Sequence, residues 1–115
     1  MKKNLPVTQN ERRLGEQSRL VSTTDLKGIT TFANDAFCDI SGFDRDALIG
    51  KHISEFYPEN EQPLSREIRA KTRDGRIWSG ETHLLRADGS AALTHNTVVP
   101  FLDGNNKHIK NLAIR

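Results

Sequence analysis

Long apolar runs and cysteine pairs are both missing from this sequence of 115 residues. No apolar stretch approaches the roughly 20 residues that a membrane-spanning helix needs. The start, MKKNLPVTQNERR, has two lysines with no apolar segment behind them, which is unlike a secretory signal. Cys38 is the one cysteine, so an internal disulfide is excluded, in keeping with a reducing compartment. We therefore expect a cytoplasmic domain that makes no contact with a membrane.

The chain also has little net charge. Its 17 basic and 15 acidic side chains give a formal charge of +2, and the basic residues are scattered between the acids. Proteins that bind nucleic acids concentrate basic side chains on one surface, so a nucleic-acid partner is not expected. A chain of this length buries roughly two-thirds of its unfolded surface, which is enough for one core and therefore one domain.

Motifs of enzymes and metal sites are absent as well. The sequence has no glycine-rich phosphate loop, no HExxH and no nucleophile elbow. The carboxylates Asp35, Asp39, Asp44 and Asp46 stand at a helix start and along short helical turns, where caps and solvated positions explain them. The spacing of His83 and His95 selects no metal. Neither an enzyme nor a metal site is expected.

The most informative stretch that is present runs from Ile29 to Phe43. Its apolar residues alternate as in a strand up to Asn34 and then repeat as on a helix face. Asn34 is a suitable N-cap for this helix, and Gly42 can end it in the left-handed conformation. Asp44 is expected to cap a second short helix, which Gly50 ends. The sequence thus predicts a strand followed directly by two short helices.

The other elements follow from the same periodicities and from Asp-Gly turns. We expect strands at Leu20–Thr24, Ile77–Arg86, Ala91–Leu102 and His108–Arg115, with a turn at Asp25–Gly28 after the first of them. The segment His52–Tyr57 follows the paired short helices, and a longer helix is expected at Glu59–Thr72. In the longer helix, Leu64, Ile68 and Lys71 are expected on one face. Five strands with helices on one face make an α+β sandwich. Residues 1–18 are polar and are expected to form an N-terminal extension, a tail or a capping helix, ahead of a domain over residues 19–115.

These elements resemble the PAS sensor domain from about Leu20 to the end of the chain. The resemblance rests on four segments in order: ANDAFCDISGF, LIGKHISEF, DGRIWSGETHLLRADGS and HNTVVPFLDGNNKHIKNLAIR. The first half, VSTTDLKGITTFANDAF, is similar to the flavin-binding PAS domains of aerotaxis receptors in bacterial chemotaxis, whereas the second half is closer to those of sensor kinases and cyclases. The resemblance implies a PAS fold, with a five-stranded antiparallel sheet and a ligand pocket under short helices. It also implies signal transduction, a homodimer and an output domain outside this chain.

Two functional alternatives stay open, a sensor that binds a small ligand and a ligand-free dimerisation or interaction module. FAD is the candidate ligand that the resemblance implies. However, Leu84-Leu85-Arg86-Ala87 stands where flavin-binding PAS domains carry Asn-Arg-Arg-Lys, and Leu84 cannot pair a polar ring edge, whose unpaired burial costs about 1–3 kcal/mol. Haem needs an axial ligand on the helical side. His52 is the one histidine placed there and is expected to be exposed, so haem is not expected.

If a ligand is bound, its contacts are expected from both walls of the pocket. The expected contacts are Phe32, Asn34, Phe37, Ile40 and Ile49 on the helical side, and Trp78, His83, Leu85 and Asn96 on the sheet.

Overall fold

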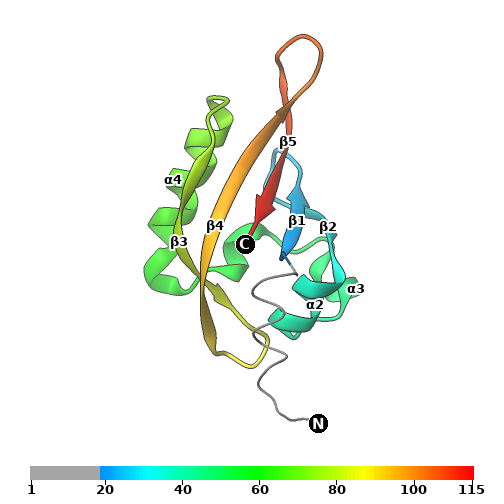
Figure 1. The fold of residues 1–115 in the computed structure, drawn as a ribbon, viewed down its shortest axis with the longest axis vertical. Coiled ribbons are helices and arrows are strands. Elements are labelled where there is room, and N and C mark those ends of the chain that lie inside the picture. The colour runs from blue at the N-terminus through cyan, green and yellow to red at the C-terminus, as the bar shows by residue number, and fades with distance from the viewer. Residues whose placement is uncertain (1–18) are drawn as a thin grey trace.

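The computed structural model describes residues 19–115, so the expected tail or helix within residues 1–18 lies outside the described range. Five strands form one antiparallel sheet in the order β2-β1-β5-β4-β3, with the helices behind it in the view of Figure 1. The elements in chain order are β1 (Val21–Thr24), β2 (Thr30–Ala33), α2 (Asp35–Ser41), α3 (Arg45–Leu48), the 3₁₀ helices η2 (Ile53–Phe56) and η3 (Glu59–Glu61), α4 (Gln62–Arg73), β3 (Trp78–Leu85), β4 (Ala91–Leu102) and β5 (His108–Ile114). The predicted α+β fold is confirmed.

The inner face of the sheet, which packs against the helices, is defined by one buried row across all five strands. Strand pairing places these residues side by side, in the order Ala33, Ser22, Ala113, Val98 and Trp78. All five are buried. Because successive side chains of a strand point to opposite faces, this row also settles which residues lie on the outer face.

Two groups of helices cover the two halves of the inner face and complete the core. Helices α2 and α3 contact β1 and β2, while α4 contacts β3 and β4. Phe37 from α2 and Phe56 from η2 are fully buried and meet edge to face, with ring centroids 5.4 Å apart. Ile68 is the buried apolar residue of α4. The core therefore lies between the inner face and the helices, as in other two-layer domains.

Local signals give most element ends correctly. The Asp25 carboxylate accepts hydrogen bonds from the amides of Lys27 and Ile29, at 2.9 Å each, and closes the predicted turn between β1 and β2. Gly42 ends α2 with a φ of 80°, and its amide donates to the carbonyl of Cys38. Both features were readable from sequence because they depend on residues within five positions of each other.

Three expectations about the helices need correction. Asp44 stands at the N-cap position of α3, but its side chain makes no capping hydrogen bond. The segment expected as one helix from Glu59 is divided into η3 and α4, and Pro63 falls in the first turn of α4, where its missing N–H costs no hydrogen bond. The buried positions of α4 are Ser65, Ile68 and Thr72, so Lys71 is not on the buried face as expected.

Candidate functional site

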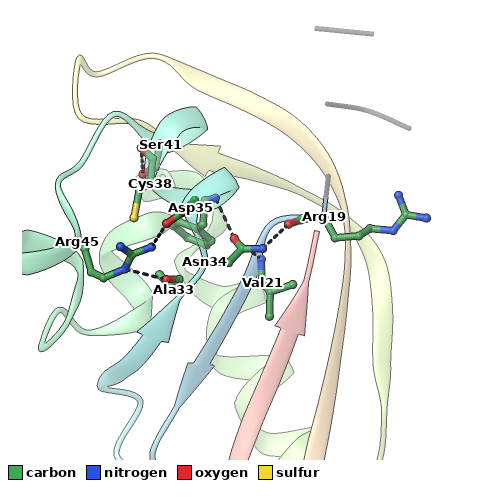
Figure 2. Close-up of polar contacts among 9 residues, drawn as sticks. Arg19, Val21, Ala33, Asn34, Asp35, Cys38, Ser41 and Arg45 are labelled. Atoms are coloured by element: carbon green, nitrogen blue, oxygen red, sulfur yellow. Dashed lines mark hydrogen bonds and ion pairs between the residues drawn. The ribbon is translucent and has the colours of Figure 1, made fainter. Parts of the chain in front are cut away.

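Asn34 joins the end of β2 to the first turn of α2, and Figure 2 shows the hydrogen bonds that it makes. Its side-chain oxygen accepts from the amides of Phe37, at 3.0 Å, and Val21, at 3.2 Å. Its side-chain nitrogen donates to the carbonyl of Arg19 at 2.7 Å. The predicted cap is confirmed, and it also ties α2 to the start of β1. Since both polar atoms are engaged by the backbone, Asn34 acts in this structure as a structural joint.

Arg45, the first residue of α3, makes contacts on either side of Asn34. Its Nε donates to the carbonyl of Ala33 at 3.1 Å, and its Nη2 pairs with the carboxylate of Asp35 (Figure 2). The hydrogen bond that Arg45 donates to the Asp35 carboxylate raises the pKa of Arg45 above its ordinary value, so the guanidinium stays charged. The pair is solvent-exposed and contributes little to stability. Its effect is to position α2 and α3 relative to the end of β2.

The sheet wall of the interior is formed by alternate residues of β3. Trp78, Thr82 and Leu84 are buried, whereas Ser79, Glu81 and His83 between them are exposed. A Cβ atom at Gly80 would lie 2.9 Å from the Trp78 ring, so the indole lies directly over this glycine. The glycine of the Trp-Ser-Gly segment is therefore needed to make room for the ring against its own strand.

A buried polar pair spans the interior from the helices to the sheet. The side-chain nitrogen of Asn96, on β4, donates to the hydroxyl of Tyr57 at 3.2 Å. Both residues are buried, and the side-chain oxygen of Asn96 has no hydrogen-bond partner within the described chain. Sequence analysis identified Asn96 but missed Tyr57. The position of Tyr57 directly after a buried Phe56 and before Pro58 is the signal that could have found it.

A second interior group that sequence analysis missed is Arg115. It continues the inner-face alternation of Ala113, and its guanidinium lies over the rings of Phe37 and Tyr57, 5.4 and 5.9 Å from their centroids. Such cation–π contacts are worth about 0.5–2 kcal/mol. The alternation of β5 was the available signal, but the contact with Phe37 depends on how α2 packs.

The nine residues expected to contact a ligand do not form one surface. Phe37, Trp78 and Asn96 are buried, and Ile40 packs against the core from α2. Phe32 is 47% exposed and pairs across the sheet with Thr23, so it lies on the outer face, contrary to the expectation.

The other expected contacts also lie away from the interior. Ile49, just after α3, is 40% exposed. His83 lies at the outer edge of β3, where Glu61 accepts from its amide at 2.9 Å and from its Nδ1 at 2.7 Å. Leu85 belongs to the outer face because the buried Leu84 precedes it. The prediction placed Leu85 on the sheet wall of the pocket, but the residue of this pair on the inner face is Leu84, one position earlier.

A small cavity of about 30 Å³ lies between the sheet and the helices. Ser22, Ile53, Tyr57, Ile68 and Val98 are among its walls, and none of the nine expected residues lines it. Drug-sized ligands and cofactors occupy pockets of roughly 300–1,000 Å³. The side chains present therefore do not fit a flavin, which would need both a tenfold larger space and polar partners where Leu84 is fully buried.

A haem or metal site is not supported by the arrangement of histidines. The Nδ1 atom of His52 accepts from the amide of Ser54 at 3.1 Å, and its Nε2 faces Arg69 at 3.4 Å and Gly28. His52 is not among the residues that line the interior cavity. Across residues 19–115 no three His, Cys, Asp or Glu side chains lie close enough together to hold a metal ion. No helix in that range is long and apolar enough to cross a membrane.

Comparison with known proteins gives a consistent family assignment. The sequence profile of the PAS domain family matches residues 19–115. The aerotaxis receptor of Escherichia coli (strain K12) is 30% identical over 97 residues, a match that covers 84% of this chain and 19% of the receptor. The chain thus corresponds to about one-fifth of that relative.

Two solved structures share the fold. The PAS domain of a protein from Colwellia psychrerythraea superposes with a TM-score of 0.77 at 21% identity, covering 92% of this chain and 91% of that one. The PAS domain of an HTR-like protein from Haloarcula marismortui superposes with a TM-score of 0.71 at 21% identity, covering 92% and 87%. At this identity the likeness concerns the fold alone.

Proposed function

Since this chain belongs to the PAS domain family, we propose that it is the signalling module of a longer cytoplasmic protein and that it acts by pairing with a second copy through its outer sheet face. The interior supports this reading over a flavin sensor, because the cavity under the helices is about 30 Å³. An output domain is proposed to lie outside this chain. The likeness to the aerotaxis receptor makes chemotaxis the candidate setting.

An apolar cluster on the outer face is the observation that carries the proposal. The outer-face cluster consists of Val21, Phe32, Val99, Leu112 and Ile114. Cross-strand pairing places Val21 beside Ile114 and Leu112 beside Val99, while Phe32 pairs with Thr23, which also pairs with Leu112. All five side chains are partly or largely exposed, and the described helices lie on the other face. Exposed apolar patches of this kind mark interaction surfaces.

A second copy is the partner proposed for this cluster. In a two-fold dimer the same patch is used by both subunits, so one apolar surface buries another. The cluster contains no charged residue, so that pairing does not require a charge to lose its water. This self-complementarity favours homodimerisation, which the family resemblance also implies.

Light scattering across a concentration series tests the pairing. The wild-type domain should be a dimer, and Phe32→Glu should weaken association at least about tenfold, because it buries an unpaired carboxylate in the contact. Leu26→Glu is the matched control, since Leu26 is 48% exposed but lies in the turn between β1 and β2. A wild-type protein that stays monomeric at high concentration would contradict the proposal.

Absorption spectroscopy tests the competing flavin sensor. The purified domain, mixed with FAD and passed through gel filtration, should be colourless. A flavin spectrum that stays with the protein would replace the ligand-free reading by one in which the core opens around the cofactor.

A further inference from the structure

A basic groove lies at one end of the molecule, and it shares Arg69 and Asn111 with the small interior cavity. Figure 1 shows the C-terminal end of α4, the β1–β2 turn and the β4–β5 hairpin at this end. The groove measures about 260 Å³, and its lining residues are Leu26, Arg69, Arg73, Lys107, His108 and Asn111. The lining includes three cations and an imidazole but no acid, which makes this a strongly positive concave surface.

The three cations have no carboxylate partners within residues 19–115. The ion pairs in that part of the chain join Arg45 to Asp35, Lys51 to Glu55 and His83 to Glu61, and none involves the groove. Arg69 and Arg73 stand one helical turn apart on α4, and Lys107 immediately precedes the first residue of β5. Like charges gathered around one concavity raise the local positive potential and attract anions.

Arg69 is weakly held where it stands. Its Nη2 donates to the carbonyl of Lys27 over a long 3.3 Å, and its Nη1 lies 3.4 Å from the Nε2 of His52. Both contacts are longer than the roughly 2.7–3.2 Å of a typical hydrogen bond from an N–H group, so each holds the guanidinium weakly. The guanidinium therefore has donors available for a better acceptor.

We propose that the basic groove binds a small oxyanion with two or more negative charges, of the phosphate or carboxylate class. Arginine side chains pair with either group through two parallel hydrogen bonds. The groove lies just below the range of roughly 300–1,000 Å³ for drug-sized ligands, which suits a molecule the size of pyrophosphate or citrate. Arg69 and Asn111 also line the interior cavity, so an anion that turns Arg69 acts at the mouth of the core. The site does not depend on dimerisation.

Calorimetric titration with sodium pyrophosphate and with sodium citrate, at constant low ionic strength, tests this site. Both Arg73→Gln and Lys107→Gln should lower the affinity about tenfold, because each removes a charge-assisted hydrogen bond. Arg76→Gln and Lys110→Gln are matched controls that remove the same charge from residues outside the groove lining. They should change the affinity less than about twofold. Arg73 and Lys107 are exposed, so their variants should fold normally.

The outcome also identifies which class of anion the groove binds, phosphate or carboxylate. Saturable binding of pyrophosphate alone assigns the groove to phosphate-bearing ligands, and binding of citrate alone assigns it to carboxylates. Either result supports the proposal. The absence of saturable binding of both anions by the wild-type protein overturns it, as does an equal loss of affinity in all four variants, which would mean a diffuse charge effect.

Discussion

The two faces of the sheet differ in how far their side chains are buried. On the inner face, Ala33 and its cross-strand neighbours are buried under the helices, whereas Phe32, one residue earlier, is 47% exposed on the outer face. The larger side chain is the one left outside. Buried and exposed side chains thus alternate along the same strands, and the size or apolarity of a residue alone does not show on which face it lies.

The sharpest contrast between the faces should appear in a pair of phenylalanine truncations. Phe37→Ala removes a fully buried ring that packs on Phe56 and under Arg115, and it should lower the free energy of unfolding by about 3–5 kcal/mol. Phe32→Ala should lower it by less than about 1 kcal/mol, because that ring is half exposed. Urea unfolding, at protein concentrations low enough for the domain to be monomeric, measures both free energies. Similar losses would mean that the outer face is covered in the folded protein.

The joint between the inner face and α2 should give the next largest effect. Asn34→Ala removes the acceptor for the amides of Phe37 and Val21, and it should cost about 1–2 kcal/mol of stability. Asp44→Ala is the matched control, because Asp44 holds the same cap position on α3 without a side-chain hydrogen bond. It should change stability by less than about 0.5 kcal/mol. If chemical denaturation gave equal losses of unfolding free energy for the two variants, the hydrogen bonds of Asn34 would not be what stabilises this part of the fold.

Glycine substitutions compare the crowded interior with an open turn. At Gly80 an added Cβ meets the Trp78 ring at 2.9 Å, so Gly80→Ala should displace the indole and cost about 1 kcal/mol. At Gly104, nothing lies within 4 Å of the added atom, and Gly104→Ala should be neutral within a few tenths of a kcal/mol. Because Trp78 is the single tryptophan, its fluorescence should shift in the first variant and stay unchanged in the second. An unshifted spectrum for Gly80→Ala would contradict the close packing.

Much of the fold was predictable from sequence because its signals are local. The change of period at Asn34, the left-handed Gly42 and the turn that begins at Asp25 each depend on neighbours within a few residues, and the structure confirms all three. The family resemblance then supplied the five-stranded antiparallel sheet, which no local signal contains, while the order of the strands came from the structure.

The candidate site was predicted less well because it depends on long-range packing. A strand alternates with a period of two, so placing Leu85 inward in place of Leu84 reverses the face. The pair of Asn96 and Tyr57 joins residues 39 positions apart. The basic groove likewise combines α4 with the start of β5, and scattered basic residues gave no hint of it. Charge counted along a chain does not report charge gathered in space.

The smallest effect on stability is expected at the exposed turn between β3 and β4, which belongs to neither face of the sheet. The hydroxyl and amide of Ser90 donate to the carboxylate of Asp88, at 2.6 and 2.9 Å, and these bonds lower the pKa of Asp88 below its ordinary value. A lowered carboxyl pKa favours the folded state above the unfolded pKa, and that contribution is lost as the pH falls through the folded pKa. Ser90→Ala should therefore raise the Asp88 pKa toward its ordinary value, as an NMR titration of the carboxyl carbon would measure. Ser79→Ala, a serine substitution in β3 that leaves this turn intact, should not move it. A pKa of Asp88 that is unchanged in Ser90→Ala would show that the hydroxyl does not hold the turn in solution.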